Sequence, residues 1–287
     1  NMESNEIIQI QLPDKQFDTA IYDSLEYAIL SIPFTINRME IQNLSTRIIN
    51  IAKGKLSEIV FKEFCITNEI PIRIDLCETP FFQPDKKDFI LGNEEWDLKN
   101  NFLFHGGPTL NTSEYLKLPA LIPNRGKWDQ WSKRNTVIHK SDCDESIILF
   151  SFMKGWDLKG GKRDNPFLSF QISDEQSIFL KTLQIKYSRK NIKHSPFSKT
   201  WFWNEMKKRG DNFIYHANIS YRPTLILMGY SNTNSWGIFE TITPKSLHSR
   251  NFAIRIKNKG ANFKNLKSFL SLYPHLKDNI QYGVILK

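Results

Sequence analysis

The chain has 287 residues, and its 39 Lys and Arg residues outnumber its 30 Asp and Glu residues, which gives a net charge of +9. A chain of this length can bury a large core, and a basic charge favours a polyanionic partner, because Lys and Arg displace the counterions condensed on phosphate. The sequence has no continuous apolar run of roughly eighteen residues, so we expect no membrane-spanning helix and no membrane partner.

Cysteine usage and the N-terminal segment both favour the cytoplasm. Cys65, Cys77 and Cys143 are widely separated, odd in number and free of any CxxC pair. This usage favours reduced thiols over a disulfide framework or a zinc site. The N-terminal segment has no basic region followed by an apolar stretch, so no signal peptide is expected. We therefore expect a cytoplasmic protein.

The first predicted elements are two helices. In residues 18–32 the apolar residues recur at intervals of three and four, as in an amphipathic helix, and Pro33 ends the pattern. The same periodicity runs over residues 44–64, with Ser45 as its predicted N-cap.

The second helical pattern carries two candidate acids. Gly54 interrupts the run, and a helix that restarts at Lys55 would hold Glu58 in its first turns. Glu58 flanks the apolar stripe, so its side chain could reach over the edge of a sheet. Glu63 lies on the same helix and is the competing candidate. A solvated helix carboxylate without a function is the alternative for either residue.

Residues 88–99, DFILGNEEWDLK, predict a β-hairpin, after a shorter alternating strand at 70–76. Gly92 and Asn93 suit a two-residue turn of type II′ or I′, because both residues tolerate positive φ. That turn fixes the register of the two strands. The expected pairs are Leu91 with Glu94, Ile90 with Glu95, Phe89 with Trp96, and Asp88 with Asp97.

This register predicts a metal site. Side chains alternate between faces, so Asp97 and Lys99 share one face, and Asp88 joins them from the partner strand. Opposed residues lie about 5 Å apart at Cβ. Two carboxylates at that distance repel each other unless a cation lies between them. Hard oxygen ligands suit Mg²⁺, and a nearby ammonium could orient a water or neutralise charge on a phosphate.

These residues resemble the PD-(D/E)XK nuclease superfamily, which includes most type II restriction endonucleases. The matching pattern is Asp88, a turn, and then Asp97-Leu98-Lys99, with Glu58 on the preceding helix, over roughly residues 44–105. The resemblance implies that Asp88, Asp97 and the Leu98 carbonyl hold Mg²⁺, that Lys99 assists the attacking water, and that Glu58 supports the metal. It also implies double-stranded DNA as the substrate and a homodimer as the assembly.

Two other matches to the motif fit less well. Pro84-Asp85 is followed by Lys86 and Lys87, so it is interpreted as the approach to the strand. The second WDLK sequence, at residues 156–159, has no acid placed to share a metal. We interpret it as the end of a strand that leads into the basic segment KGGKR. An ordinary exposed hairpin with charged residues is the alternative to the whole motif.

Three basic segments are the candidates for nucleic-acid contact. Residues 123–134 interleave basic residues with tryptophan, residues 159–163 suit a flexible phosphate-contacting loop, and residues 181–199 contain no acid. The alternative is a capped surface helix with a packed Trp for residues 123–134, and a solvated basic face for residues 181–199. The candidate residues are Arg125, Lys127, Trp128, Lys133, Arg134, Lys159, Lys162, Arg163, Lys186, Arg189, Lys190 and Lys193.

The remaining patterns predict an α/β fold, with a restriction-endonuclease-like core of a mixed central sheet flanked by helices and an additional β-rich C-terminal half. Residues 146–153 form a continuous apolar run, which predicts a strand covered on both faces. Further strands are expected at 222–230, 237–242, 252–257 and 282–287, and helices at 201–209 and 262–273. We expect a nuclease core over 1–160 and a basic part over 161–287, or one compact domain.

The sequence thus predicts a Mg²⁺-dependent endonuclease that cuts double-stranded DNA, with a type II restriction enzyme as the first hypothesis. A repair, transposition or other phage-defence nuclease of the same superfamily is the nearest alternative. A non-catalytic nucleic-acid-binding module and an RNA-directed enzyme are further alternatives. No nucleotide cofactor is expected, because the P-loop pattern fails around Gly54-Lys55. His105-Gly106-Gly107 is not followed by a GxSxG motif, so a serine hydrolase is set aside.

Overall fold

The computed structural model of the chain describes residues 2–35, 43–75, 77, 80–83, 88–124, 147–188, 190, 192–211, 217–244 and 251–287. None of the helices in this described part is both long enough and apolar enough to cross a membrane.

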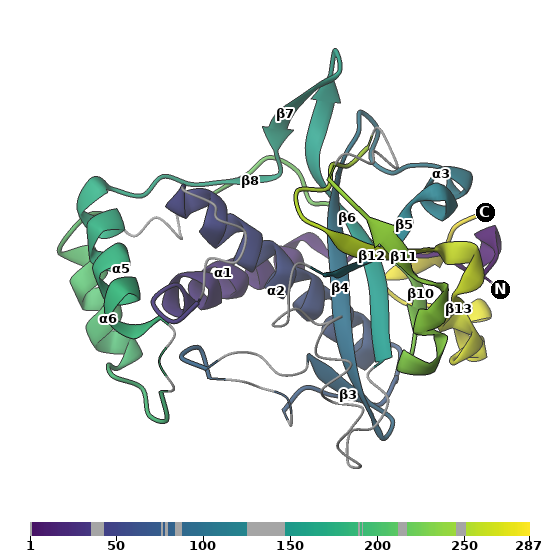
Figure 1. The fold of residues 1–287 in the computed structure, drawn as a ribbon, viewed down its shortest axis with the longest axis horizontal. Coiled ribbons are helices and arrows are strands. Elements are labelled where there is room, and N and C mark those ends of the chain that lie inside the picture. The colour runs from purple at the N-terminus through teal and green to yellow at the C-terminus, as the bar shows by residue number, and fades with distance from the viewer. Residues whose placement is uncertain are drawn as a thin grey trace.

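A curled, mixed sheet dominates the described residues, and strands from both halves of the sequence build it (Figure 1). Its order is β14-β1-β10-β6-β4-β3-β2, with β13 paired to β10 and β7 paired to β6. β4 and β6 run parallel, and the other pairs are antiparallel. The strands are β1 (Ile8–Ile10), β2 (Ile72–Arg73), β3 (Phe89–Leu91), β4 (Glu94–Phe104), β6 (Ile147–Lys159), β7 (Lys162–Pro166), β10 (Leu225–Ser231), β13 (Lys267–Ser268) and β14 (Gly283–Ile285).

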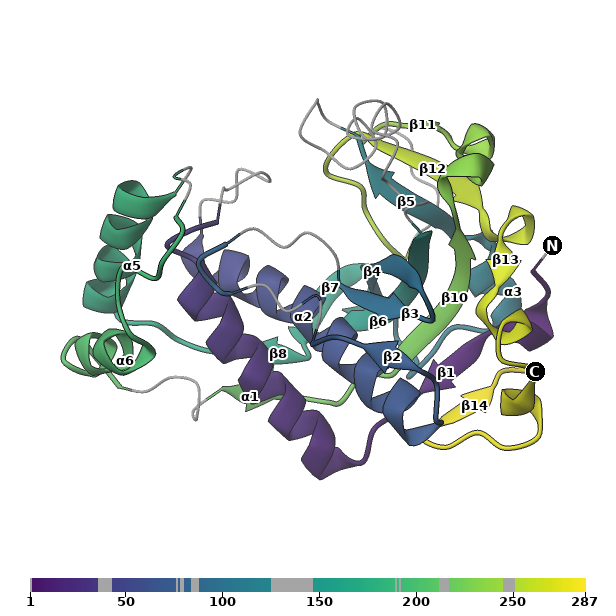
Figure 2. The same cartoon turned by 90° about the horizontal axis from the view of Figure 1, so that it is seen from below.

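The two faces of this sheet are covered differently. Helices α1 (Asp14–Ser31) and α2 (Leu44–Thr67) pack on one face. A second sheet of β5 (Pro119–Pro123), β12 (Asn258–Asn262) and β11 (Glu240–Ile242) packs on the other, as Figure 2 shows. The predicted α/β class with a mixed sheet is therefore confirmed. The expectation that helices flank the sheet holds on one face only, because the second layer is a sheet.

β6 lies between these two layers. Ile147, Leu149 and Met153 belong to the core beneath the helices, whereas Phe150 and Phe152 belong to the core beneath the second sheet. This alternation follows from the pleat of the strand. The prediction of a strand that is buried on both faces is confirmed.

Helix α2 differs in two ways from its predicted form. It is continuous from Leu44 to Thr67 and does not restart after Gly54. Its N-cap is Asn43, whose side chain accepts a 2.8 Å hydrogen bond from the Thr46 main-chain nitrogen, so the assignment of Ser45 was wrong. A single glycine lowers helix stability by only about 1 kcal/mol, which the packed apolar stripe of a 24-residue helix readily offsets.

The C-terminal part contains two wrong predictions. The strand expected at 252–257 begins only at Asn258, where pairing with β5 starts. The helix expected at 262–273 is a series of short elements that includes β13. Side chains cause the break, because Asn262 accepts a hydrogen bond from the Lys264 nitrogen and Ser268 accepts one from the Leu270 nitrogen. Such local bonds compete with a continuous helix.

Several short elements complete the described chain. The sequence predicted strands at 222–230, 237–242 and 282–287 and a helix at 201–209, and the structure has an element in each place. It did not predict β1, β5, α3 or the 3₁₀ turns. The additional elements are α3 (Thr112–Lys117) and the 3₁₀ turns η1 (Ser4–Glu6), η2 (Thr233–Ile238), η3 (Phe263–Asn265), η4 (Phe269–Ser271) and η5 (Pro274–Lys277).

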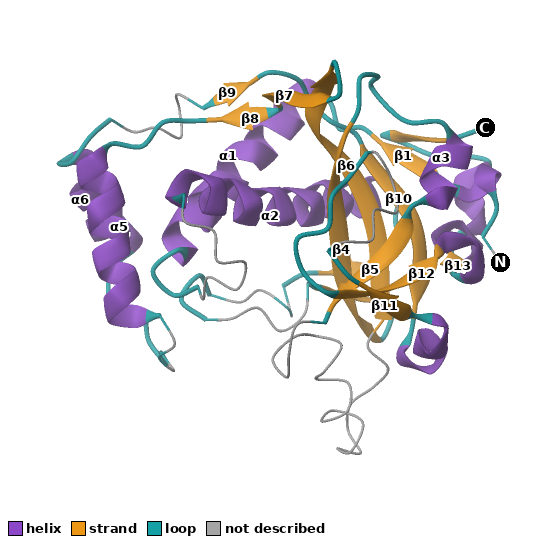
Figure 3. Cartoon of the chain, turned by 45° about the horizontal axis from the view of Figure 1, so that its top comes forward, coloured by secondary structure: helices purple, strands orange, loops and turns teal. Residues whose placement is uncertain are grey.

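Helices α5 (Asp174–Tyr187) and α6 (Lys199–Lys207) form an arm on the far side of α1 and α2 from the sheet (Figure 1). The short strands β8 (Leu168–Ser169) and β9 (Asn218–Ile219) connect this arm to the rest of the molecule (Figure 3). Sequence patterns had indicated the charge of the α5 region but not the helix.

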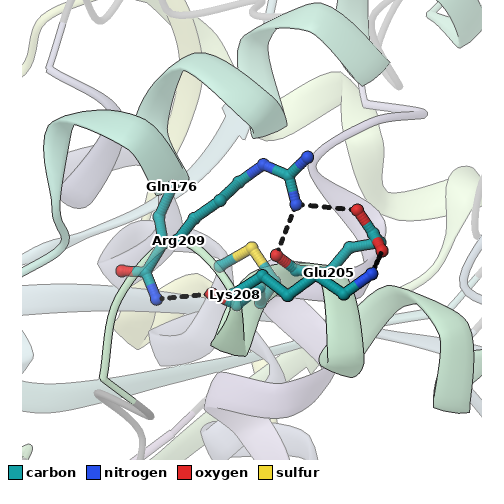
Figure 4. A network of polar contacts seen from close by, with 5 residues as sticks. Gln176, Glu205, Lys208 and Arg209 are labelled. Atoms are coloured by element: carbon teal, nitrogen blue, oxygen red, sulfur yellow. Dashed lines mark hydrogen bonds and ion pairs between the residues drawn. The ribbon is translucent and has the colours of Figure 1, made fainter.

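Polar contacts hold the two helices of the arm together (Figure 4). Gln176 of α5 donates from Nε2 to the Met206 carbonyl at 3.1 Å. Glu205 accepts from Arg209 at 2.8 Å and from Lys208 at 2.5 Å. The Gln176 bond ties the start of α5 to the end of α6, whereas the Glu205 bonds lie within α6 and the two residues that follow it.

Candidate metal and catalytic site

The central hairpin has the register that the sequence predicts. β3 and β4 pair Leu91 with Glu94, Ile90 with Glu95 and Phe89 with Trp96. Gly92 has a φ of 63°, and Asn93 does not have a positive φ among the described residues. Only the first turn residue therefore has a left-handed conformation. Of the two expected turn types, II′ and I′, this pattern is typical of type II′.

Asp88 lies directly before β3 and faces the DxK segment. Its main-chain nitrogen donates to the Trp96 carbonyl at 3.1 Å, and its Oδ2 accepts from the Leu98 nitrogen at 2.6 Å. The side chains of Asp88 and Asp97 are also hydrogen-bonded to each other. Burial raises the pKa of Asp88 well above its usual range, and the Asp97 and Glu58 carboxylates raise it further. Ionisation of both aspartates together is therefore unfavourable when no cation separates them.

Lys99 forms an ion pair with Asp97 of this pair. Its Nζ lies 2.8 Å from Asp97 Oδ1, and its side chain is partly buried. Burial alone would lower the pKa of Lys99, but Asp97 and then Asp88 hold it above its ordinary value. In β4 the apolar Leu98 belongs to the core beneath the helices, so alternation places Asp97 and Lys99 on the opposite face. The predicted sharing of a face is confirmed.

Glu58 approaches the pair from helix α2. Its Oε2 lies 2.7 Å from Lys55 Nζ, one turn earlier on the same helix. Glu58 contributes to the raised pKa values of both Asp88 and Lys99. Glu63 is not among the charges that shift these pKa values, so Glu58 is the acid of α2 that acts on the site through its charge.

The donor set at the hairpin matches a hard divalent cation in chemistry. It consists of the two carboxylates and the Leu98 carbonyl. The N–H and C=O of one strand residue point toward the same neighbouring strand. Because the Leu98 N–H donates to Asp88, the Leu98 carbonyl also points toward the Asp88 side of β4. Across the described residues, no group of three or more Asp, Glu, His and Cys side chains is gathered closely enough to hold a metal ion. Glu58 thus acts on Asp88 through its charge and not as a third side chain in one cluster.

The basic candidates fall into three groups. Lys159, Lys162 and Arg163 lie on the β6–β7 hairpin, and Lys186 lies on α5. The hairpin and the arm project from different sides of α1 and α2 (Figure 1), so the structure does not bring their cations into one patch. Lys190 and Lys193 follow α5 in the chain. Arg125, Lys127, Trp128, Lys133, Arg134 and Arg189 lie outside the described residues.

The segment expected to be a flexible loop is a regular hairpin. Gly160 and Gly161 both have positive φ, at 53° and 77°, as a two-residue type I′ turn requires. Arg163 stacks on Phe104, with 4.2 Å from its Cζ to the ring centroid. The second WDLK sequence ends strand β6, as predicted.

Sequence patterns missed Lys53, a buried lysine on α2. Lys53 is 1% exposed, and its Nζ has no hydrogen-bond partner among the described residues. The ammonium lies 3.6 Å above the Trp156 ring and 4.9 Å from the Phe102 ring. Burial, followed by the charge of Arg163, lowers its pKa to about 7. The only signal in the sequence was a lysine within the apolar stripe of a helix.

No protein-family model, curated protein or solved structure matches this chain.

Proposed function

We propose that this protein is a Mg²⁺-dependent endonuclease that hydrolyses phosphodiester bonds in double-stranded DNA, with a sequence-specific type II restriction enzyme as the most specific form of the proposal. The observation that carries it is the pairing of Asp88 with Asp97 across one hairpin, with Lys99 at 2.8 Å from Asp97. The resemblance to the PD-(D/E)XK superfamily adds the expected homodimer, and the cysteine usage adds the expected cytoplasmic location.

Asp88, Asp97 and the Leu98 carbonyl would hold the metal. When bound, Mg²⁺ would supply a water of lowered pKa and would neutralise charge on the scissile phosphate. Lys99 would donate a hydrogen bond to the attacking water or to the phosphate, because its raised pKa keeps it protonated at neutral pH. Glu58 would support the metal through its charge or through a bridging water.

Because Asp88 holds its proton more tightly than a free carboxyl group does, metal binding at the pair would depend on pH. A divalent cation must displace this proton, so its affinity rises with pH until Asp88 is ionised. Cleavage at limiting Mg²⁺ should rise in parallel. Lys99 stays protonated over this range, because its pKa lies above its ordinary value.

The functional test is incubation of the purified chain with phage-sized duplex DNA, in Mg²⁺ or in EDTA, beside the Asp97→Ala variant. Discrete fragments that require both Mg²⁺ and Asp97 would support a sequence-specific endonuclease. A metal-dependent smear would keep the nuclease and remove the restriction hypothesis, and it would favour a repair or transposition role. The same assay on RNA tests the alternative polymer.

A non-catalytic nucleic-acid-binding module is the second candidate. The observation that favours it is the Lys99–Asp97 ion pair, which already neutralises one carboxylate without a metal. In that case Asp88→Ala would leave nucleic-acid binding unchanged, and EDTA would have no effect on any measured property of the protein.

A further inference from the structure

A polar cavity lies at the far end of strand β4 from Asp97. It has a volume of about 470 Å³, and its lining includes Lys154 and Asp157 of β6, Tyr221, and Gln9 and Gln11 around β1. Asp97 pairs with Ile148 and Phe104 pairs with Trp156, so the two ends of β4 are about 20 Å apart. The cavity is therefore separate from the candidate metal site.

Two buried polar atoms at this cavity have no hydrogen-bond partner in the described part of the chain. They are the Tyr221 Oη and the Nδ1 atom of His105, which is 4% exposed. Tyr221 lines the cavity, and His105 directly precedes Gly106 in its wall. An unpaired buried polar group lowers stability, so its presence at a cavity points to a ligand that completes its bonding.

Charges in the wall are already compensated. Lys154 Nζ lies 2.5 Å from Asp157 Oδ1 and donates to the Gly107 carbonyl at 2.9 Å. Arg222 is bound to Asp18 at 2.6 Å. A phosphate or a carboxylate would find no uncompensated cation in the described wall. A neutral ligand with both donors and acceptors fits the wall better.

A bulge directs one further amide toward this cavity. Asn165 has a φ of 45° at the irregular pairing of β6 with β7, and its Nδ2 donates to Asp157 Oδ2 at 3.2 Å. Bulges of this kind often reorient a side chain beside a functional site. The same hairpin carries the exposed Lys159 and Lys162, and these two cations suit contact with the backbone of a polyanionic strand.

We propose that this cavity binds a single unpaired nucleobase of a nucleic-acid strand whose backbone follows the β6–β7 hairpin. A nucleobase combines donors and acceptors in one plane, and the cavity lining includes Tyr221 and the amide-bearing residues Gln9, Gln11 and Asn165. The proposal rests on the proposed nucleic-acid substrate, but binding in the cavity requires neither Asp97 nor Mg²⁺.

Calorimetric titration with deoxyadenosine, deoxyguanosine, deoxycytidine and thymidine in turn tests the proposal on the full chain. We expect saturable binding of at least one nucleoside. Tyr221→Phe should weaken that binding by about 5- to 20-fold, because it removes a hydroxyl that has no partner within the described part of the chain. This variant should fold, since Tyr221 Oη has no hydrogen bond to lose within the described part of the chain. Tyr115→Phe, whose hydroxyl accepts from the Leu110 nitrogen, is the control and should bind normally.

Three results would overturn the proposal. They are no saturable binding up to about 10 mM nucleoside, equal affinity in wild type and Tyr221→Phe, and binding of glucose without binding of any nucleoside. Nucleoside binding that persists in Asp97→Ala separates this site from the nuclease site. A failed cleavage assay would leave the titration fully interpretable, and a failed titration would leave the cleavage result standing.

Discussion

At the scale of residues, the site combines charges that destabilise the fold. Asp88 is held beside Asp97 and near Glu58 in a partly buried position, and the result is a raised pKa for Asp88. Binding sites often keep such unfavourable arrangements, because relieving them drives ligand binding. Stability measurements can therefore report on the site even before a substrate is known.

Asp88→Asn should raise the free energy of unfolding by about 1–2 kcal/mol at pH 8 without metal, because it removes carboxylate repulsion and keeps the bond to Leu98. The pKa of Asp88 is raised by folding, so its contribution to stability is present at low pH and is lost as pH rises through that pKa. The gain should therefore vanish at pH 4. Urea unfolding at both pH values measures it. The exposed Asp164→Asn variant is the control, and an equal gain at both pH values would contradict the assignment.

Lys53→Met should stabilise the protein at pH 7, by about 1 kcal/mol, since it replaces a buried ammonium that has no hydrogen-bond partner in the described chain. The pKa of Lys53 falls to about 7 on folding, from 10.5. Between these values the unfolded chain binds more protons, so this group makes wild-type stability rise with pH. The variant should lose that rise. Measuring the free energy of unfolding at pH 7 and pH 9.5 tests this, with Lys62→Met on the same helix as the control. If Lys53→Met keeps the full increase of stability with pH, the pKa assignment is refuted.

At the scale of elements, the sequence predicted mainly those helices, strands and turns that local interactions determine. The β3–β4 hairpin follows from Gly92-Asn93 and an alternating pattern, and its register was predicted correctly. Side-chain caps at Asn262 and Ser268 decided against the expected helix, and the apolar pattern does not show them. Strand β5 was missed, because pairing with β12 across a long separation in sequence defines it.

Gly92→Ala should lower stability by about 1 kcal/mol, because φ is 63° there while the space around the missing Cβ is empty. The strain acts on the turn that sets Asp88 against Asp97, so cleavage should fall as well. Gly54→Ala in α2 also meets no neighbour and should instead stabilise by up to about 1 kcal/mol. Thermal unfolding of both variants measures the contrast, and the same sign of change in both would count against the turn assignment.

At the scale of the whole molecule, the sheet joins distant segments that no sequence pattern connects. β1 pairs with β10 and β14, and β4 runs parallel to β6. The candidate site needed only a hairpin and one helix, so most of it could be predicted, whereas the polar cavity needed β1, β6 and the segment before β10 together. Figure 2 shows these elements converging from separate parts of the chain.

Replacing Lys186, Lys190 and Lys193 by Ala should weaken DNA binding and reduce its dependence on salt. The slope of the logarithm of the binding constant against the logarithm of the salt concentration should fall by about 0.9 for each phosphate that the protein no longer neutralises. Replacing Lys159 and Lys162 should have an additive effect, because the hairpin and the arm are separate elements. Binding measured from low to moderate salt tests both. An unchanged slope in the triple variant would remove the arm from the DNA interface.

The central claim is that Asp97 serves catalysis through a metal and not DNA binding. The most direct test measures cleavage and DNA affinity side by side in wild type, Asp97→Ala and Lys99→Ala, with Mg²⁺ for cleavage and Ca²⁺ for binding. We predict that both variants lose cleavage, and that Asp97→Ala binds DNA as tightly as wild type or more tightly, because a carboxylate that repels phosphate is gone. Cleavage that survives in folded Asp97→Ala, or affinity that falls with it, would contradict the proposed role.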